Sequence, residues 1–94
     1  MTEPFPLPWY SPEGYARLRE ASSDGERMPP SYEMWVPSAL QIEGELKRLG
    51  RATQRVTVEA EPFLEWCQAR SMAPDGAARH AYAKAMVESG GPVE

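Results

Sequence analysis

The sequence predicts a small, mostly helical α+β domain with the element order α-α-β-α-α. Its 94 residues are enough for one domain, so we treat residues 1–94 as a single unit. Four segments begin with residues that favour a helix start and continue with apolar residues at helical spacing. A fifth segment, residues 53–59, alternates polar and apolar residues and is rich in β-branched side chains, the pattern of a strand.

Residues 1–10 are predicted to form a Pro-rich extended arm. The prolines of the stretch Pro4–Pro8 exclude a helix, and a strand that contained them could lie only at a sheet edge. Trp9 and Tyr10 would face water if the arm were a disordered tail, which is the alternative interpretation. We therefore expect the arm to lie on another surface of the domain.

The first helix is predicted to begin at Ser11 and Pro12, an N-cap residue followed by a residue that suits the first helical position. It should end near Ala21. Residues 22–30 are polar, contain Gly25 and end in two prolines, so we expect a mobile loop there.

A second and longer helix is predicted from Ser31, as its cap, to Gly50, as the residue after its end. Pro37 conflicts with a continuous helix, so either the helix restarts at Pro37 or it is kinked there. Glu43 and Lys47 are expected to pair on its outer face. The predicted buried stripe, which Leu40 widens, consists of Trp35, Ala39, Ile42, Leu46 and Leu49.

Two further helices are predicted after the strand. One begins at Glu61 and Pro62 and ends near Ser71, and the last begins at Pro74 and Asp75. Residues 90–94 are expected to be a tail. The apolar faces of these helices carry Phe63, Trp66 and Cys67 in the first, and Ala78, Tyr82, Ala85 and Met86 in the second.

A lone strand leaves its backbone groups without partners, and this predicts pairing with a second copy of the chain. An antiparallel pair centred on Thr57 would place Arg55 opposite Glu59 of the other chain, and Val56 opposite Val58. Opposite charges across strands contribute about 0.2–1 kcal/mol each. The residues assigned to this homodimer interface are Arg55, Val56, Thr57, Val58 and Glu59.

Charge argues against nucleic acid as a partner. The net charge is −4, and neither half of the chain is basic, whereas phosphate contacts require basic patches. A strand followed by two helices is also the pattern of ribbon-helix-helix DNA-binding proteins. In that arrangement Arg55, Thr57 and Glu59 would face the DNA, and the carboxylate of Glu59 would be repelled by phosphates.

The residues that could carry chemistry are few. Cys67 and His80 are the single cysteine and the single histidine, and together they could form a nucleophile with its base. Cys67 falls on an apolar helix face, which favours a structural role, and His80 is expected to face solvent. One cysteine and one histidine do not make a structural zinc site. We expect no enzymatic activity, no cofactor and no metal.

The aromatic residues suggest a second function, the binding of a ligand. Trp9, Tyr10, Trp35 and Trp66 could line a pocket for a small ligand or a peptide. The chain has few Leu and Ile residues, so the alternative is that these rings form the core.

Three short stretches resemble a group of small uncharacterised bacterial proteins. They are Trp9–Ser11 with Tyr15, Ser31–Trp35, and Pro62–Cys67 with the downstream residues Pro74, Ala78 and Arg79. The resemblance covers the chain from about Trp9 to Met86 and implies a shared fold. It implies no activity and no site residues, and Pro37 departs from it.

These observations favour a non-enzymatic protein-interaction or assembly module. The alternatives are a small-ligand-binding protein with an aromatic pocket and, third, a ribbon-helix-helix-like regulator. No apolar run reaches the roughly 18 residues of a membrane span. A single cysteine and an N-terminus with an acid and prolines fit the cytoplasm, where we expect the protein.

Overall fold

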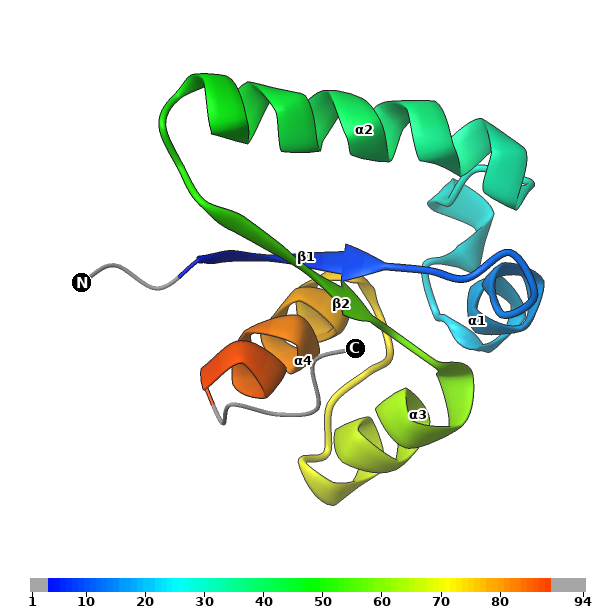
Figure 1. Ribbon diagram of the computed structural model, residues 1–94. Coiled ribbons are helices and arrows are strands. Elements are labelled where there is room, and N and C mark those ends of the chain that lie inside the picture. Colours follow the sequence, from blue (N-terminus) through cyan, green and yellow to red (C-terminus); the bar gives the residue numbers. More distant parts are fainter. Residues whose placement is uncertain (1–3, 89–94) are drawn as a thin grey trace.

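The computed structural model describes residues 4–88 and combines helices with a small parallel sheet (Figure 1). The α+β class is therefore confirmed, but residues 5–9 of the predicted arm form a strand. The elements in order are β1 (Phe5–Trp9), α1 (Tyr15–Ala21), a 3-10 helix η1 (Gly25–Arg27), α2 (Tyr32–Arg48), β2 (Thr53–Thr57), α3 (Ala60–Ala69) and α4 (Gly76–Glu88).

The two strands form one parallel sheet, with Phe5 opposite Thr53 and Trp9 opposite Thr57. The prediction that β2 is a lone strand is therefore wrong. The Pro-rich segment pairs with β2 because its prolines occupy alternate positions, and alternate residues of a strand direct their backbone groups to opposite sides. A second copy was predicted because the sequence shows no partner strand for β2, and β1 now supplies that partner. Pairing with a second copy itself stays a prediction.

Helices lie on both sides of the sheet, with α2 above it and α4 below it in Figure 1. The core lies where α1, α3 and α4 meet the ends of the strands. Its largest fully buried side chains are those of Tyr15, Leu18, Phe63 and Cys67. The buried cluster consists of Tyr10, Tyr15, Leu18, Met28, Val58, Ala60, Phe63, Cys67, Ala78 and Tyr82.

The structure confirms the predicted start of α2 and places the start of α1 later than predicted. Ser31 caps α2 as expected, because its Oγ accepts the N–H of Met34 at 3.3 Å. Ser11 also accepts an N–H through its Oγ, from Gly14 at 2.9 Å, but this bond closes a turn that precedes α1. The helix itself therefore starts at Tyr15, later than predicted.

Helix α2 passes through Pro37 without interruption, so a restart at that residue is excluded. Pro37 cannot donate a hydrogen bond to the carbonyl oxygen of Glu33, one turn earlier. Both residues are exposed, and water can satisfy that oxygen. A proline on the solvent side of a helix costs less than one on a buried side for this reason.

The predicted buried stripe of α2 is largely wrong. Ala39 is buried, and Trp35 packs against the core, but Leu40, Ile42 and Leu49 are 48%, 55% and 77% exposed. A sheet of two strands is narrow, so it covers only the residues of α2 that point straight at it. One of those residues is Glu43, which is 7% exposed.

The last two helices agree with the prediction in their order and their inner faces. Helix α3 ends at Ala69, two residues early, and Asp75 caps α4 by accepting the N–H of Ala78 at 2.9 Å. Ala78 and Tyr82 are buried, as the stripe predicts. The predicted tail, residues 90–94, lies outside the described residues.

Candidate functional site

The structure brings together three of the four residues predicted to line an aromatic pocket. The Trp35 ring centroid lies 5.0 Å from that of Trp9 and 4.7 Å from that of Tyr10. Trp66 lies elsewhere, with its ring 5.5 Å from Tyr82. The predicted group of four is therefore split between two parts of the molecule.

Two tyrosines that the sequence analysis did not assign to the pocket complete this cluster. The rings of Tyr15 and Tyr32 lie 6.0 and 5.7 Å from that of Trp35. Tyr15 also donates a hydrogen bond to the carbonyl oxygen of Pro29 at 2.6 Å. Ring pairs at these separations stabilise one another as core residues do. The cluster joins the end of β1 to α1 and α2.

An ion pair between the buried Glu43 and the exposed Arg55 links α2 to β2. The Nε and Nη2 atoms of Arg55 each donate to a carboxylate oxygen of Glu43 at 2.8 Å. The guanidinium carbon also lies 3.9 Å from the centroid of Trp9 on β1. The hydrogen bonds from Arg55 hold the pKa of Glu43 below its usual value, despite burial. Glu43 is therefore buried and does not lie on the outer face with Lys47, where it was predicted. The pairing of Arg55 with Glu59 of a second copy stays a prediction, and within the chain Arg55 is already paired with Glu43.

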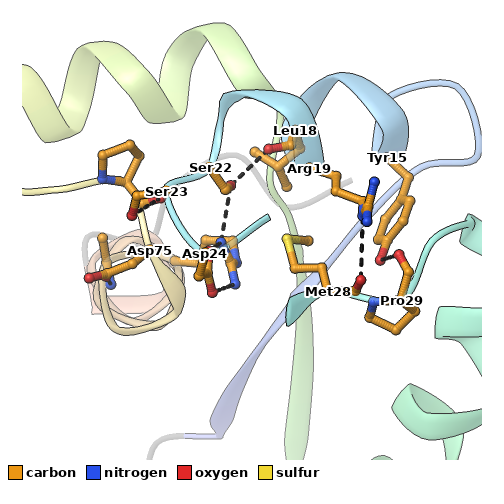
Figure 2. Close-up of polar contacts among 12 residues, drawn as sticks. Tyr15, Leu18, Arg19, Ser22, Ser23, Asp24, Met28, Pro29 and Asp75 are labelled. Carbon is orange, nitrogen blue, oxygen red and sulfur yellow. Dashed lines mark hydrogen bonds and ion pairs between the residues drawn. The ribbon is translucent and has the colours of Figure 1, made fainter. Parts of the chain in front are cut away.

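A second ion pair, deeper in the molecule, fixes α4 to the loop before η1. Arg79 is 6% exposed and donates to Oδ1 and Oδ2 of Asp24 at 2.9 and 2.8 Å. Its Nη1 also donates to Oγ of Ser22 at 3.1 Å, and that hydroxyl donates to the carbonyl oxygen of Leu18 (Figure 2). Neither Asp24 nor Arg79 was identified as a functional candidate, because a distant ion pair has no local sequence signature.

The segment predicted to be a mobile loop, residues 22–30, is tied down at several points (Figure 2). Arg19 donates to the carbonyl oxygen of Met28 at 3.3 Å, and the backbone N–H of Ser23 donates to that of Pro74 at 2.8 Å. Met28 itself is buried in the core. The loop thus acts as a connector between α1 and α4.

We expect the Asp24–Arg79 pair to make stability depend on pH. The hydrogen bonds from Arg79 lower the pKa of Asp24 from its ordinary value of 3.8. A carboxyl whose pKa is lowered in the folded state stabilises the fold above its unfolded pKa, and this contribution is lost as pH falls through the folded value. Urea unfolding between neutral pH and pH about 3 should therefore show a smaller loss of stability in Asp24→Asn than in the wild type. Equal losses in both proteins would contradict this expectation.

A hollow of about 380 Å³ lies beside this ion pair and is lined by polar residues. The lining residues are Ser23, Asp24, Glu26, Arg27 and Asp75. Asp24 is bound to Arg79, and Asp75 caps α4, so two of its three carboxylates already have structural partners. Between residues 4 and 88, no three His, Cys, Asp or Glu side chains are grouped closely enough to hold a metal ion.

Cys67 and His80 have different surroundings. Cys67 is 2% exposed within the core, and burial raises the pKa of its thiol. His80 is exposed, as predicted, with its ring 5.6 Å from that of Phe5. A buried thiol with a raised pKa is a poor nucleophile at neutral pH.

We therefore expect the Cys67 thiol of the folded protein to react slowly with Ellman's reagent. In a denaturant that unfolds the chain, it should react at the rate of an ordinary exposed cysteine. A fast reaction of the folded protein at neutral pH would contradict the structural role that burial indicates. Unfolded protein serves as the internal control, because it contains the same single thiol.

The two edges of the sheet are the remaining candidates for a functional site, and they differ in the backbone groups that they offer to a further strand. The N–H of Phe5 donates to the carbonyl oxygen of Ala52 at 2.8 Å, and the N–H of Val58 donates to the carbonyl oxygen of Trp9 at 2.9 Å. Backbone groups alternate in direction along a strand, so odd-numbered residues of β1 face even-numbered residues of β2. Thr53, Arg55 and Thr57 therefore direct their N–H and C=O groups away from β1. We call this side, formed by Thr53, Arg55 and Thr57, the outer edge of β2.

Prolines close the opposite edge of the sheet, which is formed by β1. Pro6 and Pro8 occupy the positions of β1 that point away from β2, and proline has no N–H to offer. Such prolines prevent another strand from adding to an edge. The outer edge of β2 contains no proline and pairs with no other strand in the described part of the chain, and both Arg55 and Thr57 are exposed.

Comparison with known proteins assigns the chain to no class. No family model, no curated protein and no solved structure matches it. The resemblance to a group of small bacterial proteins consequently stays a prediction. No helix in the described part of the chain has both the length and the apolar character needed to cross a membrane.

Proposed function

We propose that this protein is a non-enzymatic interaction module that binds an extended polypeptide segment at the outer edge of β2. One observation carries the proposal: prolines close one edge of the sheet, and within residues 4–88 no strand pairs with the other edge. A strand that adds to an open edge gains main-chain hydrogen bonds along its length, and the side chains beside that edge provide specificity.

The geometry of β2 suits this mode of binding. Its three outward residues, Thr53, Arg55 and Thr57, offer backbone donors and acceptors at the regular spacing of a strand. Strand β2 is also held in place by β1 and by the contacts of its own side chains. Its even-numbered residues bond to β1, the Val56 and Val58 side chains are buried, and Arg55 is fixed by Glu43. A rigid edge reduces the entropy that binding costs.

The test removes one outward N–H and leaves the ladder to β1 intact. Thr57→Pro deletes a donor on the outer edge, whereas Thr57→Val keeps the donor and the strand-forming character of the side chain. Tagged wild type, Thr57→Pro and Thr57→Val are each used to recover bound polypeptides from the native host. We expect the wild type and Thr57→Val to recover the same polypeptides and Thr57→Pro to lose them. Equal recovery by all three would contradict binding at this edge.

A further inference from the structure

We infer that the segment bound at the outer edge of β2 is the β2 strand of a second copy of this chain, running antiparallel and centred on Arg55. The inference rests on the proposed function, because it names the occupant of the same edge. It gives a four-stranded sheet in the order β1-β2-β2-β1.

The outward backbone groups of β2 have the symmetry that an antiparallel pair of identical strands requires. In an antiparallel pair, opposite residues of the hydrogen-bonded kind exchange both their N–H and C=O groups. A twofold axis at Arg55 places Thr53 opposite Thr57 of the second copy, and Thr57 opposite its Thr53. All three outward residues then form pairs of the bonded kind, which gives about six new backbone hydrogen bonds.

The side chains of Thr53, Arg55 and Thr57 are also compatible with this interface. Thr–Thr pairs across strands are favourable, and the twofold axis supplies two of them. Two arginines face each other at the centre, which would repel if their charges were free. Each guanidinium, however, is neutralised by Glu43 of its own chain and lies over Trp9 on β1, away from the outer edge.

The structure also shows why the axis lies at Arg55 rather than at Thr57. An axis at Thr57 would require the carbonyl oxygen of Glu59, which already accepts the N–H of Phe63 at the start of α3. It would also place Thr53 opposite Glu61 of the second copy, a helical residue that cannot pair with a strand. Arg55 is the central residue of β2 as observed.

Pairing of two β2 strands leaves no open edge in the four-stranded sheet. An isolated two-stranded sheet is marginal, and doubling it adds a hydrogen-bonded strand on the open side of each β2. The free edges of the resulting sheet are both β1, where Pro6 and Pro8 block further addition. Assembly therefore stops at two copies, as an isologous twofold interface requires.

Sedimentation equilibrium of the purified protein tests this inference. We expect the wild type and Thr57→Val to be dimers and Thr57→Pro to be a monomer with an unchanged circular dichroism spectrum. A monomeric wild type would overturn the inference, as would a Thr57→Pro variant that remains dimeric. If the wild type is monomeric but Thr57→Pro still loses a polypeptide in the recovery experiment, the proposed function stands and the second copy is excluded.

A cross-linking experiment covers the case in which Thr57→Pro does not fold. In the double variant Thr53→Cys/Thr57→Cys, each new thiol lies opposite the other kind in the second copy, within the reach of a disulfide. Oxidation should therefore give a covalent dimer that reductant cleaves. The single variants Thr53→Cys and Thr57→Cys should stay monomeric on a non-reducing gel. A covalent dimer of Thr57→Cys alone, or none from the double variant, would overturn the inference.

Discussion

Replacing Arg79 by methionine should lower the free energy of unfolding by about 3–5 kcal/mol, the cost of removing one partner from a buried ion pair. Arg79 is 6% exposed and binds Asp24 through two hydrogen bonds. Methionine fills similar space but leaves the carboxylate of Asp24 and the hydroxyl of Ser22 without this donor. Urea unfolding followed by tryptophan fluorescence measures the change.

Arg17→Met is the matched control for this prediction. Arg17 pairs with Glu61 on the surface, where both side chains are more than half exposed. Exposed pairs are screened by water and contribute little to stability, so this variant should differ little from the wild type. If Arg79→Met were no more destabilising than Arg17→Met, the loop and α4 would not depend on the buried pair as described.

Replacing Phe63 by alanine should lower the free energy of unfolding by about 3–5 kcal/mol, the usual range for a buried phenylalanine. Its side chain is fully buried, and its ring meets that of Tyr82 edge-on at 5.7 Å. The truncation removes apolar burial and leaves a cavity between α3 and α4. Urea unfolding by circular dichroism provides the measurement.

Leu49→Ala is the control for this second prediction and also tests the exposure of α2. Leu49 is 77% exposed although the periodic pattern predicted it to be buried. Its replacement should change stability by no more than about 0.5 kcal/mol. A large loss in Leu49→Ala, comparable with that of Phe63→Ala, would mean that the C-terminal half of α2 is covered in solution.

The helices could be predicted because their signals are local. Ser31, Pro62 and Asp75 mark helix starts through chemistry that acts within one turn, and all three lie within a residue or two of a start or inside a first turn. Phe63 and Tyr82 follow helical spacing, and both are buried. Such patterns depend on neighbours in sequence and need no knowledge of the tertiary fold.

The sheet could not be predicted in the same way. The pairing of Phe5 with Thr53 spans most of the chain, and three prolines between residues 4 and 8 argued against a strand. Their spacing did contain a usable signal, because prolines at alternate positions leave the other side of the strand free to bond. A pattern that excludes a central strand is compatible with an edge strand whose N–H groups face inward.

The sequence predicts an interface along β2, which stays a prediction, but it does not identify Glu43 as the ion-pair partner of Arg55. Arg55 and Thr57 were expected at an interface with a second copy, and both are exposed at the open edge of β2. The sequence predicts Glu59 of a second copy as the partner of Arg55, and within the chain the structure pairs Arg55 with Glu43. Glu43 was placed on the outer face because the sequence does not show that a charged residue of α2 would be buried against an arginine of β2.

Amide hydrogen exchange along β2, measured by NMR over a range of protein concentrations, tests the central claim most directly. Gln54, Val56 and Val58 direct their N–H groups toward β1 and should be protected at every concentration. Thr53, Arg55 and Thr57 should exchange rapidly in dilute protein and become protected as the concentration rises and a second copy occupies the outer edge. Rapid exchange of the outward amides at the highest protein concentration would contradict this claim. So would outward amides that, at the lowest protein concentration, are as protected as the inward amides.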